Sequence, residues 1–399
     1  MIGRRGFLGA AAGALAWGSS AARGGPPQAS KDARKAKASK PKDAPVEADE
    51  QTDRVLAPVR DAHRLPGLIG AIVRGDAVAA IGAVGVRKIG SDAPITAADR
   101  VHLGSCTKAL TATLIGTVVD EGKLRWDSTL AEVFPGHAKV MHPGFRRATL
   151  AHLLTHRAGL PHDGPWWELG RNRTTTDQRR ELIPRMLRTA PESTPGETYA
   201  YSNVGYALAG LMAEQATGRP WERLIRDRLF TPLGMASAGF GPPGSSGRVE
   251  EPWGHREVDG RTEATREDNA PALGPAGTVH VSLPDWAKFA SLHLRAGQGK
   301  PRLLKAETFR ALQTPAPGSD YCGGWYSVER SKFGGRALTH EGSNLSWYAG
   351  VWVAPASDLA VLVAVNKGGD DAGVACKEAA DALLRLDAYR HPGGKTRRR

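Results

Sequence analysis

The sequence RVHLGSCTKALTATLIGTVVDEG, residues 100–122, passes from a β-like stretch through a glycine into an apolar helix. Apolar residues recur every three or four positions after Ser105 and stop at Gly122, which predicts a helix over 105–121. Lys108 follows Ser105 by one turn and lies on the same helix face. The stretch therefore places a hydroxyl, an amine and the positive end of a helix dipole close together.

A serine and a lysine at this spacing can serve as a nucleophile and its proton acceptor. Burial lowers the pKa of a lysine, and the neutral amine can then accept the serine proton. The spacing is weak evidence by itself, because Ser39 in SKPK matches it too and an ordinary helix cap would also explain Ser105. Other segments of the chain have to support the pair.

Strand-like runs occur near both ends of the chain. Residues 68–75 and 77–86 read as a hairpin around a Gly-Asp turn, and residues 346–355 and 359–366 repeat the pattern before a helical stretch at 371–390. Helices are predicted between these ends at 149–156, 177–189, 203–217, 220–229 and 284–296. We expect one antiparallel sheet built from both chain ends, covered by helices and interrupted by a helical insertion.

Length and charge restrict the class of protein. The chain has 399 residues, 41% of them apolar, which suffices for a folded core. The formal net charge is +13, but residues 1–50 carry nine Lys/Arg against five Asp/Glu and residues 390–399 carry five against none, so the body has only about +4. This balance argues against a nucleic-acid partner.

The two ends of the chain are expected to lie outside the folded domain. Residues 1–23 contain Arg4 and Arg5 before a short apolar run and resemble a twin-arginine signal peptide, which predicts a periplasmic or secreted protein. Residues 24–51 form a Lys/Ala/Pro-rich linker without aromatic residues. Residues 391–399 form a basic tail, which is either a solvated end or a contact to a membrane surface or cell-wall polymer.

Cysteine and histidine spacing gives no metal motif. The three cysteines form no CxxC pair, and a Cys322–Cys376 bridge stays open. His152 and His156 share a predicted helix face but lack an HExxH glutamate and a third ligand, so no metal site is expected.

Further motifs follow Ser105 in a fixed order, namely ATLAHLLTHRAGLP, the Y-x-N triplet 201–203, FTPLGM, GPAGTVHVSLPDWAKFA and HEGSNLSWYAGVWVAP. Together they resemble the serine β-lactamase and penicillin-binding-protein superfamily, in particular class C β-lactamases and DD-peptidase-like serine hydrolases. The resemblance covers about residues 53–370. It implies an α+β fold, an α/β/α sandwich of the β-lactamase/transpeptidase type, over residues 52–390 with the helical insertion at roughly 115–265.

The resemblance also implies a role for each matching residue. Ser105 would be the acylated nucleophile, Lys108 its proton partner, and Tyr201 a second general base with an anionic or strongly hydrogen-bonded phenol. Asn203 would contact the carbonyl side of the substrate or hold Lys108. The backbone N–H groups of Ser105 and Ser343 would form the oxyanion hole.

The third motif departs from the family pattern. Many relatives read Lys-Thr-Gly where this chain reads His340-Glu341-Gly342. Gly342 keeps an open backbone for the substrate. His340 is mostly neutral near pH 7, and Glu341 adds a negative charge, so we expect weaker recognition of a substrate carboxylate than a lysine would give.

These observations predict an exported serine hydrolase that cleaves an ester or amide bond through a Ser105 acyl-enzyme, without a metal or organic cofactor. The partner would be a small-molecule ester, amide or peptide. One alternative is a β-lactamase or DD-carboxypeptidase, and another is a non-catalytic protein that binds cell-wall fragments. Cys106 is expected to pack inward, and Trp166 and Trp167 form either an aromatic substrate wall or hydrophobic packing under a loop.

Overall fold

The computed structural model describes residues 47–170 and 172–391. The expected signal peptide, nearly all of the linker and nearly all of the basic tail lie outside these residues. The folded chain begins slightly before the expected boundary, because Asp49 accepts a hydrogen bond from the Thr52 amide and caps helix α1 (Glu50–Ala62). No helix in the described part of the chain is long and apolar enough to span a bilayer.

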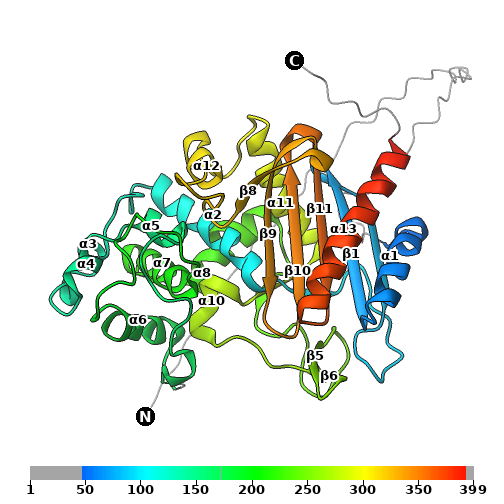
Figure 1. The fold of residues 1–399 in the computed structure, drawn as a ribbon, viewed down its shortest axis with the longest axis horizontal. Helices are drawn as coiled ribbons and strands as arrows, with labels where there is room; N and C mark the ends of the chain where they lie inside the picture. The colour runs from blue at the N-terminus through cyan, green and yellow to red at the C-terminus, as the bar shows by residue number, and fades with distance from the viewer. Residues whose placement is uncertain (1–46, 171, 392–399) are drawn as a thin grey trace, which may run out of the picture. The chain divides into compact units, whose positions relative to one another are not determined.

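A six-stranded antiparallel sheet forms the centre of the fold (Figure 1). Its strand order is β2 (Ala77–Gly85), β1 (Gly67–Arg74), β11 (Leu359–Val365), β10 (Tyr348–Ala354), β9 (Gly335–Ser343) and β8 (Tyr326–Arg330). Strand β1 pairs with β11, so that Ile72 lies opposite Val361. The sheet therefore joins the two ends of the chain, which confirms the predicted α+β class.

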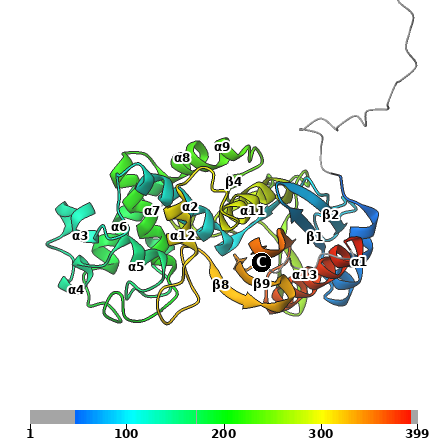
Figure 2. The same cartoon turned by 90° about the horizontal axis from the view of Figure 1, so that it is seen from above.

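Helices cover both faces of this sheet (Figure 2). Helices α1 and α13 (Asp370–Arg390) pack on one face, where they share a buried cluster with strand residues such as Val361. Helix α11 (Leu283–Gly297) packs on the other face. Every residue of β11 is buried because this strand is covered from both sides, which explains its unbroken apolar sequence.

A second, mainly helical region lies beside the sheet (Figure 1). Its central helices are α2 (Thr107–Asp120) and α7 (Asn203–Thr217), which contact each other and are almost entirely buried. The remaining helices are α3 (Leu130–Val133), α4 (Pro143–Arg146), α5 (Leu150–Leu154), α6 (Thr175–Met186), α8 (Trp221–Ile225), α9 (Thr231–Leu233), α10 (Gly274–Gly277) and α12 (Ala306–Gln313). The predicted helices all occur, and the helix over 203–217 has the predicted bounds.

Two small sheets were not predicted. Strands β3 (Arg100–His102), β7 (Val279–Ser282) and β4 (Gly239–Phe240) form one, and β5 (Gly254–Val258) and β6 (Arg261–Thr265) form the other. The β-like stretch before Ser105 is confirmed as strand β3, but the strands of the first sheet are only two to four residues long, which is too short to predict their pairing. Strand β3 matters for function because the chain leaves it directly into the turn that carries Ser105.

The possible disulfide does not form. Cys322 and Cys376 are both free and buried. They belong to different core clusters, Cys322 to the one that contains α11 and Cys376 to the one under α1 and α13. The central sheet separates these clusters.

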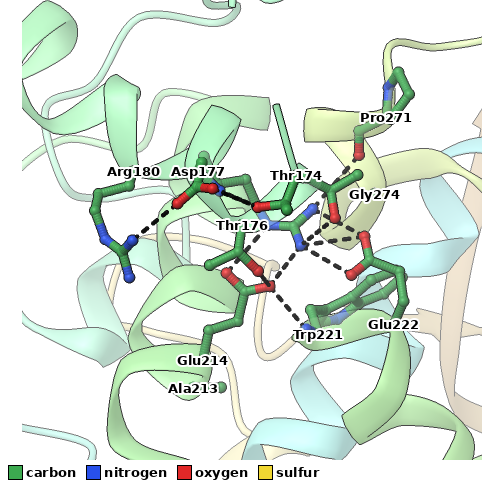
Figure 3. Close-up of polar contacts among 12 residues, drawn as sticks. Thr174, Thr176, Asp177, Arg180, Ala213, Glu214, Trp221, Glu222, Pro271 and Gly274 are labelled. Atoms are coloured by element: carbon green, nitrogen blue, oxygen red, sulfur yellow. Dashed lines mark hydrogen bonds and ion pairs between the residues drawn. The ribbon is translucent and has the colours of Figure 1, made fainter. Parts of the chain in front are cut away.

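A cluster of charged side chains, with a buried arginine at its centre, links several helices of this region (Figure 3). Arg179 of α6 is fully buried, and its Nη2 atom lies 2.5 Å from Glu214 Oε1 of α7 and 3.0 Å from Glu222 Oε2 of α8. Arg179 also donates to the carbonyl of Pro271, just before α10. One guanidinium therefore connects three helices with the segment that leads into α10.

Candidate active site

Ser105 lies in a tight 3₁₀ turn, Gly104–Cys106, between strand β3 and helix α2. The predicted helix thus begins two residues late, at Thr107. Gly104 has a φ of +49°, a conformation that favours glycine. The turn leads the chain into α2, which is almost entirely buried, and places Ser105 just before the start of this helix.

Lys108 is fully buried and makes three polar contacts. Its Nζ atom lies 3.0 Å from Ser105 Oγ, 2.8 Å from Asn203 Oδ1 and 2.9 Å from the carbonyl oxygen of Ala276. Burial lowers the pKa of Lys108 to about 7, although the nearby charge of Asp163 acts in the opposite direction. The structure therefore brings a lysine that can be neutral near pH 7 against the candidate nucleophile.

Tyr201 and Asn203 come from the start of α7. Ser202 caps this helix by accepting from the Gly205 amide and donates to the Pro161 carbonyl, which fixes the residues on either side of it. The Ser105 side chain acts to lower the pKa of Tyr201. Burial outweighs this effect and raises the pKa, so a neutral phenol fits the site and a phenolate does not.

Lys108 meets Tyr201 at the face of its ring, while burial keeps the phenol neutral. Lys108 Nζ lies 4.8 Å from the centre of the Tyr201 ring, over its face. The amine thus contacts the π-face of the ring. The free protein therefore holds one group near its ionisation midpoint at neutral pH, Lys108, beside a protonated phenol.

Asp163 belongs to this site and was missed in the sequence. Asn203 Nδ2 donates to Asp163 Oδ1 at 2.9 Å, and Trp166 Nε1 donates to the same oxygen at 3.0 Å. Burial raises the pKa of Asp163, but these hydrogen bonds and one from His162 outweigh burial and leave the pKa below its ordinary value. The anionic carboxylate fixes the Asn203 amide with its oxygen toward Lys108.

Trp166 therefore has a hydrogen-bonding role beside the site, whereas Trp167 is 61% exposed.

Cys106 packs inward, as expected. It is buried, its Sγ lies 3.4 Å from the His340 carbonyl oxygen, and burial raises the pKa of its thiol well above the ordinary value. A buried, protonated thiol is a poor nucleophile.

His340 is buried and directed away from solvent. Its Nδ1 lies 2.6 Å from the Glu341 carbonyl oxygen, and its Nε2 lies 3.1 Å from the Tyr321 hydroxyl. Burial and the charge of Lys108 lower the pKa of His340 to about 3. The ring is therefore neutral, with its proton on Nδ1, and supplies no positive charge to the site.

Glu341 does not face the site, contrary to the expectation. It accepts from the Tyr348 hydroxyl at 2.6 Å and pairs with Lys377 of α13 at 3.2 Å. Successive residues of a strand point to opposite faces of a sheet, so Glu341 lies on the α13 face while His340 and Gly342 lie on the other. Glu341 therefore adds no charge to the cleft side of the strand.

Strand β9 crosses the Ser105 turn at two glycines. A Cβ atom at Gly342 would lie 2.1 Å from the Leu103 carbonyl oxygen and 2.6 Å from Ser105 N. A Cβ atom at Gly104 would lie 2.4 Å from Ser343 N. The backbone amides of Ser105 and Ser343 therefore meet at one close crossing that only glycine permits.

His156 is a second residue whose place in the site was missed. It follows the end of α5 with a φ of +57°, and its ring centre lies 4.3 Å from that of Tyr201. In the sequence it was considered only with His152 as a metal pair. His152 instead accepts from the Thr149 amide as part of the cap of α5. Among the described residues, no cluster of His, Cys, Asp or Glu could hold a metal ion.

The fold and this arrangement define a class of serine hydrolases. The family model described as Beta-lactamase matches residues 52–385, so the chain belongs to the Beta-lactamase family. The protein is thus a serine hydrolase related to β-lactamases and penicillin-binding proteins.

Individual relatives support this placement. Penicillin-binding protein 4 of Amycolatopsis lactamdurans is 28% identical over 331 residues, which cover 78% of this chain and 83% of that protein. Unguisins hydrolase ungD of Aspergillus violaceofuscus is 26% identical over 76% of this chain but only 58% of its own length. The octameric penicillin-binding protein homologue of Pyrococcus abyssi has the same fold, with a TM-score of 0.68, 21% identity, and coverage of 85% of this chain and 77% of its own.

Proposed function

We propose that the protein cleaves an ester or amide bond by two-step acyl transfer through Ser105. One observation carries the proposal, namely the fully buried Lys108 amine 3.0 Å from Ser105 Oγ. With a pKa of about 7, much of this amine is neutral near neutral pH and free to accept a proton.

In the first step, Lys108 accepts the Ser105 proton while Ser105 Oγ adds to the substrate carbonyl carbon. The carbonyl oxygen becomes an oxyanion that the amides of Ser105 and Ser343 stabilise. Tyr201, a neutral phenol, passes a proton to the leaving group as its bond breaks and is reprotonated from Lys108. In the second step, water loses a proton to Lys108 as it adds to the acyl carbon, the bond from that carbon to Ser105 Oγ breaks, and Lys108 returns the proton to Oγ, which releases the acyl group as a carboxylic acid.

The third motif favours substrates that do not depend on a charged carboxylate contact. A lysine at position 340 would be a fixed cation, whereas His340 is buried and neutral. The proposed substrates are therefore small esters, amides or peptides. Two relatives named above, a penicillin-binding protein and a hydrolase, are compatible with this range.

Initial rates of the full chain on p-nitrophenyl butyrate and on nitrocefin test the proposal. We expect ester turnover that disappears in Ser105→Ala, and little turnover of nitrocefin, which carries a carboxylate. Equal ester rates for the wild type and Ser105→Ala would remove Ser105 from the mechanism. Efficient nitrocefin turnover would instead place the protein with the β-lactamases and overturn the inference from His340.

We also propose that the protein is exported by the twin-arginine route. The support is the sequence of residues 1–23, with Arg4 and Arg5 ahead of the short apolar run. Replacing both arginines by lysine should retain the esterase inside cells that otherwise release it to the periplasm or medium. The same distribution of activity in the variant and the wild type would contradict this route.

A further inference from the structure

A buried polar network joins the two segments that carry the Ser105 and Ser343 amides. It starts at His102, the last residue of β3, which is fully buried. The Gly104 amide, immediately before Ser105, donates to His102 Nδ1 at 3.1 Å. Because Nδ1 accepts, a ring proton has to be on Nε2.

The network continues through Asp268 to the other segment. His102 Nε2 lies 3.0 Å from Asp268 Oδ1, a close contact without the alignment of a hydrogen bond, and Asn344 Nδ2 donates to the same oxygen at 2.8 Å. Asn344 immediately follows Ser343, and its Oδ1 accepts from the Ser346 amide at 3.2 Å. One carboxylate oxygen therefore connects the residue before Ser105 with the residue after Ser343.

Asp268 is not an ordinary surface acid. Its side chain is 8% exposed, and its Oδ2 atom is buried without a hydrogen-bond partner among the described residues. Burial raises the pKa of Asp268, but the interaction with His102 and the hydrogen bonds to Oδ1 outweigh burial and keep the carboxyl ionised. A buried carboxylate with one unused oxygen costs stability, which calls for an explanation beyond folding.

The next residue links the same segment to the lysine. Asn269 Nδ2 donates to the Gly277 carbonyl at 2.7 Å. Gly277 follows Ala276, whose carbonyl oxygen accepts from Lys108. The segment that carries Asp268 therefore supports both amide-bearing segments and the carbonyl that orients the amine.

We propose that His102 and Asp268 are positioning residues for the oxyanion hole. His102 holds the turn before Ser105, and Asp268 holds the chain after Ser343, so together they set the separation of the two amides. The inference rests on the proposed function and deepens it. Because the amides act most strongly on a tetrahedral oxyanion, their displacement should weaken the transition state more than substrate binding.

Inhibition by butylboronic acid measures this effect directly. Ser105 Oγ adds to the trigonal boron and gives its proton to the enzyme base, which leaves a tetrahedral boronate anion in the site. In His102→Leu and Asp268→Ala, we expect the inhibition constant to rise about 10- to 100-fold and kcat on p-nitrophenyl butyrate to fall in parallel. The KM of the ester should change less than about threefold.

Conservative variants separate positioning from loss of folding. His102→Asn retains an acceptor for the Gly104 amide, as in an Asx turn, and Asp268→Asn retains an oxygen for Asn344. Both should keep kcat and the inhibition constant within about fivefold of wild type. Rates are expressed per active site, counted by fluorophosphonate titration, so that misfolded protein does not contribute.

His280 supplies the matched control. It lies opposite His102 in the pairing of β3 with β7, is also buried, and contacts the Gly241 carbonyl instead of the Ser105 turn. His280→Leu should leave both constants per active site unchanged. An unchanged boronate constant in His102→Leu and Asp268→Ala, or an equal change in His280→Leu, would overturn the inference. Failure of the proposed function would show separately, as wild-type protein that takes up no fluorophosphonate.

Discussion

His156 accepts hydrogen bonds from the residue before Tyr201 and from the residue after it. Its carbonyl oxygen accepts from the Ala200 amide at 2.8 Å, and its Nδ1 accepts from the Ser202 amide at 3.0 Å. The two rings lie with their centres 4.3 Å apart. One histidine in a left-handed conformation therefore fixes the backbone before and after Tyr201 and covers one face of its ring.

Replacing His156 should impair catalysis through Tyr201. We expect His156→Ala to lower kcat on p-nitrophenyl butyrate about 10- to 100-fold, since a small displacement of a proton donor is costly. His156→Asn should lose less, because asparagine adopts a left-handed conformation readily and its side-chain oxygen can accept from Ser202. Steady-state kinetics per active site decide this, and equal losses in both variants would contradict the account.

The pH dependence should report Lys108. Since only the neutral amine accepts the Ser105 proton, kcat/KM for a neutral ester should fall about tenfold per pH unit below the Lys108 pKa of about 7 and level off above it. His340, with a pKa of about 3, stays neutral throughout this range. A rate profile from pH 5 to pH 9 measures the inflection, and a flat profile across pH 7 would count against Lys108 as the base.

Asp163 should shift that inflection. Its negative charge raises the pKa of Lys108, so Asp163→Asn should move the inflection to lower pH. His162 is exposed and contacts Asp163, which makes His162→Gln the control. The inflection should persist in His162→Gln. An upward shift or no shift in Asp163→Asn would contradict the proposed electrostatics.

The glycine at the strand crossing should be intolerant of substitution. Gly342→Ala places a methyl group 2.1 Å from the Leu103 carbonyl and must push β9 away from the Ser105 turn. We expect at least a 100-fold loss of kcat/KM and a lower melting temperature. Gly136→Ala is the control, because a Cβ atom there meets no heavy atom within 4 Å. Near-normal activity of Gly342→Ala would mean that the close crossing is not required.

The buried arginine of the helical region should be important for stability. Arg179→Met leaves Glu214 buried without its cation and should lower the free energy of unfolding by about 3–5 kcal/mol. Arg180, the next residue, forms an exposed pair with Asp177, so Arg180→Met should cost less than about 1 kcal/mol (Figure 3). Urea unfolding compares the two variants, and similar losses would contradict the importance of burial.

The sequence predicts the parts of this fold that depend on local patterns. In the terminal hairpins, apolar residues alternate with polar ones or fill whole strands. Helix 203–217 has a serine N-cap and Gly218 at its C-terminal end, so the hairpins and this helix can both be predicted from the sequence. The β-like stretch before Ser105 indicates the short strand β3 but not the sheet to which it belongs. Its partner β7 lies far away in the chain, and only the folded structure shows that pairing.

In the site, too, contacts between near neighbours in the chain can be predicted, whereas contacts between distant segments cannot. Ser105 and Lys108 are neighbours on one helix, so their contact can be predicted from spacing alone. Asp163 and His156 act through loops, whose approach to Asn203 and Tyr201 depends on tertiary packing. Side chains alternate between the two faces of a strand. The position of Glu341 on the face opposite to Gly342 could therefore have been inferred from the sequence, since Gly342 was expected to face the nucleophile.

The central claim is that Ser105 is the residue that becomes acylated. Mass spectrometry of the intact protein after reaction with an alkyl fluorophosphonate tests it most directly. We predict one adduct per chain, located at Ser105, no adduct in Ser105→Ala, and normal labelling in Ser39→Ala, whose serine matches the same short motif. Undiminished labelling of Ser105→Ala, or a wild-type adduct at another residue, would contradict the account.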